Sequence, residues 1–285
     1  MKKTNKTNFH LYRYQILPLS RSHQQALFDD IGSIEELIEQ KNRLFSEVLL
    51  GISEFVYSKA ELTHKLRHQE GEFYLFKFGV YRAISREKKD FTAEELDNWP
   101  SFFVGIWNNP DKQFIFVEER TSAFQHSSAF VKIFQSNLND RFSRRNLTLE
   151  IEPLFEDKSF WEVVDKFRGK VQSIDFELIT PNMANISGAL SGDLKALAKS
   201  TDTIKTNLKL NSSKSSHLNI ATDNSMIDGL VDYSSSGGGD IKFSVRGLKK
   251  KISLGKTVKT IQVDNIESTG INTKDLSDLI KSMVE

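Results

Sequence analysis

The sequence predicts an α+β fold, with an N-terminal mixed α/β region built on a mainly antiparallel sheet and a C-terminal strand-rich α+β domain. Apolar residues alternate or cluster in short runs in some segments and recur at helical spacing in others. The composition changes near Arg168, after which Ser, Thr, Asn, Lys and Gly dominate and no Trp occurs. A chain of 285 residues is long enough for two domains. We expect them at residues 1–168 and 169–285.

The first third of the chain predicts strands separated by helices. Residues 9–19 are rich in aromatic and aliphatic side chains and predict a strand that stops at Pro18. Ser33 opens a capping box, and apolar residues recur at helical spacing behind it. Residues 52–68 predict a second helix, and residues 73–84 predict a strand rich in Phe and Tyr.

The next segment predicts a hairpin, a helix, a strand and a short helix. Two apolar runs within residues 101–118 flank an Asn-Asn-Pro-Asp turn signal, which indicates a hairpin. Thr121 or Ser122 then caps a helix with one aromatic face. Apolar and polar residues alternate over 147–152, as in a half-buried strand, and a short helix is expected at 160–167.

Short strands and helices are also expected beyond the change in composition. Strands are expected at 171–180, 203–210 and 217–221, where apolar residues lie between turn signals. Helices are expected at 190–199 and 226–231.

The C-terminal part of the chain combines a glycine tract with a basic strand. The Ser-Gly tract at 234–239 has the composition of a flexible loop. Residues 241–246 alternate apolar with polar or basic side chains and predict a strand. A lysine-rich turn follows, a strand returns over 258–263, and a last amphipathic helix is expected over 273–283.

The most informative feature is the positive charge of residues 241–260. The whole chain has 39 Lys and Arg against 38 Asp and Glu, yet this stretch has no acidic residue. Such a cluster is typical of a surface that binds phosphates. The alternative interpretation is a solvated, lysine-rich hairpin that keeps the edge of a sheet from aggregating. We expect Lys242 and Arg246 on the solvent face of one strand, and Lys256 and Lys259 on its neighbour. The candidate nucleic-acid-binding residues are Lys242, Arg246, Lys249, Lys250, Lys251, Lys256 and Lys259.

A second basic patch follows the helix that is expected to end near Leu138. Arg141, Arg144 and Arg145 are candidates for further phosphate contacts. Cations at a helix C-terminus also stabilise the helix dipole, which is a sufficient structural reason for them.

Composition excludes several classes of chemistry. The chain has no Cys, so disulfides, thiol nucleophiles and thiolate zinc sites are excluded. No apolar run is long enough for a transmembrane helix, and the N-terminus lacks the apolar core of a secretory signal. We therefore expect a cytoplasmic protein. No phosphate-binding loop or dinucleotide fingerprint is present, and we expect no cofactor.

Three weaker patterns were weighed as catalytic or metal sites. His64 and His68 have the spacing of a helical zinc pair but lack a general base and a third ligand. Arg120 and His126 match a spacing used by metal-independent ribonucleases. The carboxylates within residues 150–157 have the composition of a metal-nuclease site. Each pattern has a simpler surface explanation, so we expect no catalytic residue and no metal ligand.

Several short segments carry a resemblance to a known family. They are Trp99–Val104, Ser122–Phe124, Leu149–Leu154, Val171–Pro181 and Val245–Lys249. Their order resembles that of the RexA-like phage exclusion proteins and, more distantly, of KwaB from the Kiwa defence system, over Pro100–Ile266. The resemblance implies a homodimeric, sequence-tolerant binder of double-stranded DNA that activates a partner, such as a membrane protein encoded alongside. The family's basic strand falls on Arg246 and Lys249.

The functional prediction is a DNA-binding sensor or adaptor of an abortive-infection type anti-phage system. It contacts phosphates through the basic strand and turn. One alternative is a nuclease effector of such a system. Another is a module that docks an acidic protein or an anionic lipid and binds no nucleic acid.

Overall fold

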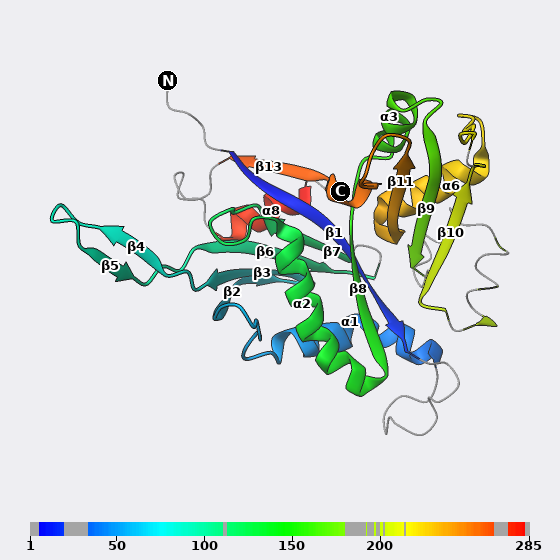
Figure 1. Ribbon diagram of the computed structural model, residues 1–285. Helices are drawn as coiled ribbons and strands as arrows, with labels where there is room; N and C mark the ends of the chain where they lie inside the picture. The colour runs from blue at the N-terminus through cyan, green and yellow to red at the C-terminus, as the bar shows by residue number, and fades with distance from the viewer. Residues whose placement is uncertain are drawn as a thin grey trace. The chain divides into compact units, whose positions relative to one another are not determined.

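The computed structural model describes residues 6–19, 34–110, 113–179, 192, 197, 200, 201, 203–213, 215–264 and 273–282. The fold is α+β, as predicted, and the strand pairs whose register is given below are antiparallel. The chain forms two compact units (Figure 1). Unit 1 comprises residues 1–10, 42–141 and 260–285, and unit 2 comprises residues 11–41 and 142–259. Each unit therefore takes residues from both sides of position 168.

Unit 1 is built on a sheet with the strand order β13-β1-β7-β6-β3-β2. Its strands are β1 (Lys6–Pro18, as far as His10 in this unit), β2 (Leu62–Glu70), β3 (Phe73–Val80), β6 (Ser101–Asn108), β7 (Gln113–Glu118) and β13 (Thr260–Asp264). The predicted hairpin of β6 and β7 is confirmed. A second hairpin, of β4 (Ile84–Glu87) and β5 (Ala93–Leu96), forms a sheet of its own. Almost every residue of β3, β6 and β7 is buried, because helices cover both faces of the sheet.

The helices of unit 1 are the C-terminal part of α1 (Ile34–Leu50), α2 (Ser127–Phe142, as far as Arg141 in this unit) and α8 (Thr273–Ser282). Phe130 of α2 packs edge-on against Phe78 and Phe102, so α2 covers that face. On α8, the Lys281 ammonium lies 5.3 Å from the centre of the Phe73 ring. Because Phe73 and Phe78 have opposite parity on β3, α8 covers the other face.

Two helix predictions in unit 1 are wrong in part. Residues 62–70 form the edge strand β2, which pairs with β3, and not a second helix. Pairing with a buried strand outweighs the helical pattern of this polar segment. The helix α2 begins at Ser127 and not at Thr121 or Ser122, because residues 121–126 form turns. Ser33, the expected cap of α1, lies outside the described residues.

Unit 2 contains a four-stranded sheet with the order β10-β9-β11-β12. Its strands are β9 (Val171–Ile179), β10 (Lys205–Asn211), β11 (Gly239–Val245) and β12 (Ile252–Ser253), with helices α3 (Lys158–Lys166) and α6 (Ser225–Tyr233). In the core of this unit, Phe160 of α3 stacks near Phe243 and Phe176. The strand β8 (Leu147–Pro153) pairs separately with the Tyr12–Pro18 part of β1.

The structure corrects three predictions for residues 217–264. Residues 217–221 form no strand. The tract Ser234–Gly238 is a buried turn of π-helix and not a flexible loop, since a Cβ at Gly238 would lie 2.3 Å from the Tyr233 ring. The returning segment β13 pairs with β1 and not with β11. The helix expected at 190–199 lies almost entirely outside the described residues.

Within the described ranges, no helix combines the length and apolar character that crossing a membrane requires.

Candidate functional site

The solvent face of the unit 2 sheet carries both signs of charge. The Lys242 ammonium donates to Glu177 Oε1 at 2.5 Å, and Lys251 bonds Asp175. Both carboxylates belong to β9, the central neighbour of β11. Burial alone would lower the pKa of Lys242, but the bond to Glu177 and nearby carboxylates outweigh burial and raise it. Lys242 therefore stays protonated, and the Glu177 carboxylate of β9 offsets its positive charge.

Arg246 does not continue this face. β11 ends at Val245, with a register shift just before it, and Arg246 lies exposed beyond the strand end. Its backbone N–H donates to the Lys170 carbonyl at 2.9 Å, and its guanidinium Nη2 donates to the Ser216 carbonyl at 2.8 Å. Arg246 thus ties together three turns, the one before β9, the one after β10 and the one after β11.

Positive charge remains uncompensated where these turns meet. Lys170, Lys249 and Lys250 are exposed, and within the described residues none of them has an ion-pair partner. Together with Arg246 they form what we call the basic end of unit 2. Lys170 was not among the residues expected from the sequence, because it lies 76 or more positions before the other members of the basic end.

Lys256 and Lys259 lie at the other end of β11. Lys256 is in a 3-10 turn at Leu254–Lys256, where the Gly255 N–H donates to Asp240 near the start of β11. Lys259 lies 4.0 Å from Glu156 and precedes β13. The expectation that both occupy a strand beside β11 is therefore wrong. The length of β11 separates them from the basic end by roughly 20 Å.

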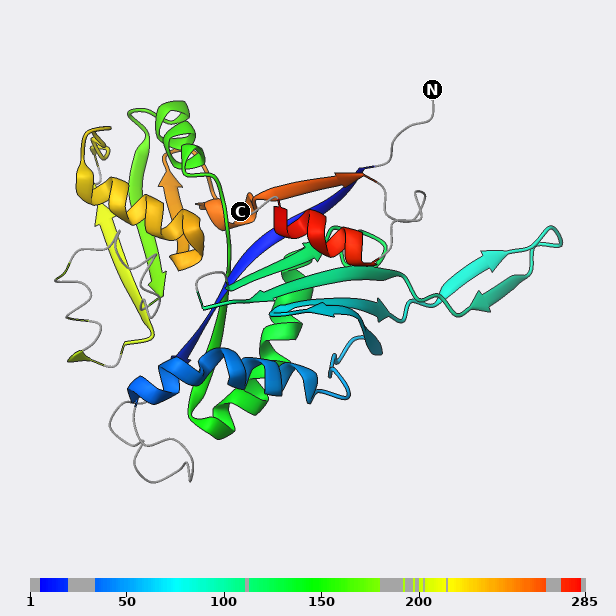
Figure 2. The same ribbon diagram turned by 180° about the vertical axis from the view of Figure 1, so that it is seen from behind.

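The three arginines of the second patch are divided between the two units. Arg141 lies in the last turn of α2, in unit 1, whereas Arg144 and Arg145 lie in the 3-10 turn before β8, in unit 2. Within unit 2, the starts of β8 and β9 lie far apart in both views (Figures 1 and 2). The predicted second patch does not extend the basic end.

A pocket of about 400 Å³ adjoins the basic end. Its wall includes His217, which directly follows the Ser216 carbonyl held by Arg246. Its lining mixes apolar with polar and charged side chains, and the Leu218 N–H donates to the Val171 carbonyl. The remaining lining residues are Val164, Asp165, Arg168, Gly169, Asn219, Ile220, Ala221, Thr222 and Asp223. A pocket of this size is within the range of small-ligand sites.

The histidine pair is not formed. A register shift between Leu66 and His68 puts His64 opposite Phe78 and His68 opposite Leu75, on different faces of β2. His64 packs against the rings of Phe55 and Phe78, and burial lowers its pKa. Among the described residues, no cluster of His, Asp and Glu has the arrangement of a metal site.

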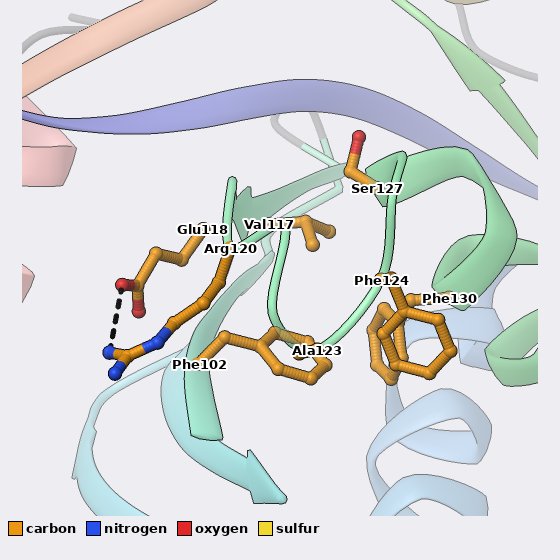
Figure 3. A pocket seen from close by; sticks show the side chains of 8 residues that line it. All are labelled: Phe102, Val117, Glu118, Arg120, Ala123, Phe124, Ser127 and Phe130. Carbon is orange, nitrogen blue, oxygen red and sulfur yellow. Dashed lines mark ion pairs between the residues drawn. The ribbon is translucent and has the colours of Figure 1, made fainter. Parts of the chain in front are cut away.

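Arg120 and His126 share no cavity that would hold a phosphate. Arg120 lies 4.0 Å from Glu118 at the edge of a small pocket lined by Phe102, Phe124 and other apolar residues (Figure 3). The pocket has a volume of about 10 Å³, which accommodates one water molecule. His126 does not line it and is exposed.

A serine–histidine contact in unit 1 was not expected from the sequence, because its two residues lie 117 positions apart. Ser127 Oγ and His10 Nδ1 form a hydrogen bond of 2.6 Å, and His10 Nε2 lies 3.8 Å from Glu119 Oε2. The latter distance is too long for a hydrogen bond. Ser127 is only 6% exposed, and burial lowers the pKa of His10. We interpret the contact as a clasp between β1 and the start of α2, since the hydroxyl is closed to a substrate.

The carboxylates of residues 150–157 have separate structural roles. Lys205 Nζ lies 2.9 Å from Glu150 Oε2 and 3.7 Å from Glu152 Oε1. Burial raises the pKa of Glu152 to about 7, against the opposing effect of Lys205. Asp157 caps α3 by accepting from the Lys158 N–H.

Comparison of this chain with protein-family models, curated proteins and solved structures finds no match.

Proposed function

We propose that this chain is a sequence-tolerant DNA-binding component of an abortive-infection type anti-phage system, and that the basic end of unit 2 contacts duplex phosphates. The observation that carries the proposal is the convergence of Lys170, Arg246, Lys249 and Lys250 in three adjoining turns. None of the three lysines has an ion-pair partner among the described residues. Exposed, unpaired cations of this kind bind a phosphate backbone without reading bases.

Under this proposal, the charge distribution predicts that DNA binding is local and salt-sensitive. The adjoining sheet face is balanced by Asp175 and Glu177, so little positive potential extends along it. A site with three or four phosphate contacts gives a salt slope of roughly −3. The resemblance to RexA-like proteins supports the proposal, since their basic strand falls on Arg246 and Lys249. It also implies a membrane-protein effector as partner.

Fluorescence anisotropy of a labelled DNA duplex over a salt series tests the proposal. The test variant is Lys249→Glu/Lys250→Glu, because neither side chain has a hydrogen bond or an ion pair with another described residue, whereas Arg246 holds the turns together. The matched control is Lys256→Glu/Lys259→Glu, which changes the net charge equally at the other end of β11. We expect the test variant to lose most binding, with a salt slope shallower by roughly two, and the control to retain it.

Two outcomes would overturn the proposal. Absence of duplex binding by the wild type at low salt would remove the DNA interpretation. Equal loss in the test and control variants would show that overall charge, and not the basic end, governs binding.

Lipid docking is the second candidate, and one residue favours it. Leu248 is 47% exposed between Arg246 and Lys249, and an apolar side chain flanked by cations suits an anionic membrane surface. Under this alternative, Leu248→Ser weakens binding to phosphatidylserine vesicles. Under the DNA proposal, the same substitution leaves duplex binding unchanged.

A further inference from the structure

The pocket beside the basic end has no role in the proposed contact with duplex phosphates. It measures about 400 Å³, which is within the range of sites for small organic ligands. Three segments line it, namely the C-terminal end of α3, the start of β9 and the segment 217–223 before α6. The first two lie side by side in both views (Figures 1 and 2). All three segments belong to unit 2, so the pocket lies within one unit.

The lining of the pocket offers hydrogen-bonding groups to a ligand. Four of its polar side chains are exposed, those of His217, Asn219, Thr222 and Asp223. Within the described part of the chain, none of these four side chains has a hydrogen-bond or ion-pair partner. Leu218 and Ile220 also line the pocket and are only partly buried against the core of the unit. A ligand that fits this lining combines apolar surface with hydrogen-bonding groups.

The carboxylates of the pocket favour a ligand that carries N–H donors. Asp165 is paired with Arg168, with an N···O distance of 2.7 Å. Asp223 has no such cation among the described residues, so its carboxylate repels a phosphate and accepts hydrogen bonds from N–H groups. The planar groups of His217 and Arg168 are of the kind on which an aromatic heterocycle stacks. The part of the ligand inside the pocket is therefore an uncharged heterocycle with N–H donors.

Positive charge lies at the rim of the pocket. Lys170 directly follows the lining residue Gly169 and is exposed, and it has no ion-pair partner among the described residues. The Arg246 guanidinium donates to the Ser216 carbonyl, which directly precedes His217 of the pocket wall. These two cations attract an anionic group that remains outside the pocket. A ligand that suits both regions has a neutral heterocycle at one end and a phosphate at the other.

We propose that this pocket binds a nucleoside 5′-phosphate, with the base inside and the phosphate against Lys170 and Arg246 at the rim. Asp223 accepts from an exocyclic amino group of the base, as carboxylates do from cytosine. Adenine, guanine and cytosine carry such a group, whereas thymine does not. The nucleotide is either free in solution or the terminal unit of a DNA strand. The site shares two cations with the proposed function, but nucleotide binding does not require that a duplex binds.

Isothermal titration calorimetry with deoxynucleoside 5′-monophosphates tests the pocket. We expect dGMP, dAMP and dCMP to bind at least about tenfold more tightly than dTMP. Asp223→Ala should abolish this preference, because the acceptor of the amino group is lost. The matched control is Asp232→Ala, which makes the same change in net charge on an exposed residue outside the pocket and should keep the preference.

Two further variants separate the base from the phosphate. Lys170→Gln should reduce the advantage of dGMP over deoxyguanosine, which has no phosphate, and leave the affinity for deoxyguanosine unchanged. Ala221→Phe places a large ring in the lining and should abolish binding of both compounds. Thermal unfolding measured in parallel confirms that each variant is folded.

A comparison of two DNA forms distinguishes the sources of the nucleotide. If the terminal unit of a strand is bound, a linear duplex with 5′-phosphates binds more tightly than a closed circular duplex, and Ala221→Phe removes the difference. If the nucleotide is free, the two forms bind equally and dGMP displaces both. A chain that binds dGMP and no duplex would refute the proposed function alone. Absence of dGMP binding by the wild type, equal affinities for dGMP and dTMP, or a dGMP affinity unchanged by both Asp223→Ala and Ala221→Phe would overturn this inference.

Discussion

The protonation of individual residues in unit 2 depends on neighbours that are distant in sequence. Glu152 lies on β8 and is largely buried beside Lys205, with Glu150, Asp240 and Glu177 nearby. Burial raises its pKa to about 7, from an ordinary value of 4.5. The folded state therefore binds this proton more tightly than the unfolded chain does. The resulting stabilisation is complete below pH 4.5 and is lost as the pH rises through 7.

Replacing Glu152 with Gln should make stability less dependent on pH. We expect Glu152→Gln to gain on the order of 2 kcal/mol relative to the wild type between about pH 5 and about pH 8, because the amide cannot ionise. Urea denaturation of both proteins at the two pH values measures this. An equal free-energy difference at both pH values would contradict the raised pKa of Glu152.

The clasp between Ser127 and His10 makes a second prediction at this scale. Ser127→Ala leaves the half-buried His10 Nδ1 without its hydrogen-bond partner, and we expect a loss of about 1–2 kcal/mol in the free energy of unfolding. The control is Ser128→Ala, since Ser128 is adjacent and exposed. Chemical denaturation that finds the two variants equally stable would show that the contact contributes nothing.

At the scale of elements, the strand β9 determines how much of the basic sequence is available to a ligand. Lys242 and Lys251 belong to the stretch without acidic residues, yet both are paired with carboxylates of β9. The pairing partner of Lys242 lies 65 positions away in the sequence. A count of charge along the chain cannot detect such a partner, because the register of the sheet brings it close.

Removing the β9 carboxylates should strengthen DNA binding if the proposed function is correct. In Asp175→Asn/Glu177→Gln, Lys251 loses its carboxylate partner on β9, whereas Lys242 loses Glu177 but keeps Asp240 at 3.9 Å. We therefore expect tighter binding with a salt slope steeper by about one. The control is Glu54→Gln/Glu61→Gln, which makes the same change in net charge on exposed residues of unit 1. Anisotropy that shows the same gain in both variants would assign the effect to net charge alone.

Elements whose apolar residues recur with a clear period were predicted correctly. Elements whose conformation depends on contacts with distant segments of the chain were not. The alternation in β8 and β11 and the amphipathic pattern of α3 and α6 agree with the structure, because burial of one face produces that pattern directly. Residues 62–68 were predicted as part of a helix, and pairing with β3 makes residues 62–70 a strand. The buried turn at 234–238 was predicted as a flexible loop, since close packing and flexibility both favour glycine.

At the scale of the whole molecule, the two units do not follow the order of the chain. Unit 2 includes part of β1 as well as residues 142–259, and unit 1 includes the C-terminal β13 and α8. The core of unit 2 contains Phe155, Phe160 and Val164, which precede the change in composition at Arg168. A boundary inferred from composition cannot divide the chain in this way, because it assumes continuous segments.

A fragment of residues 169–285 tests the boundary predicted from composition. This fragment lacks Phe160 and the other core residues of the Phe155–Val164 stretch, and we expect it not to unfold cooperatively. Circular dichroism during thermal unfolding, with the full chain as control, measures this. A sharp transition in the fragment would establish that residues 169–285 fold independently.

The sequence by itself determined the α+β class, the β6–β7 hairpin and the presence of a basic segment, because each of these leaves a pattern among neighbouring residues. Only the tertiary structure decided which cations remain unpaired, that Lys170 joins Arg246, Lys249 and Lys250, and that a pocket adjoins them. These properties depend on which strands pair and in which register. The free energy that selects the pairing comes from burial and hydrogen bonding between segments far apart in the chain.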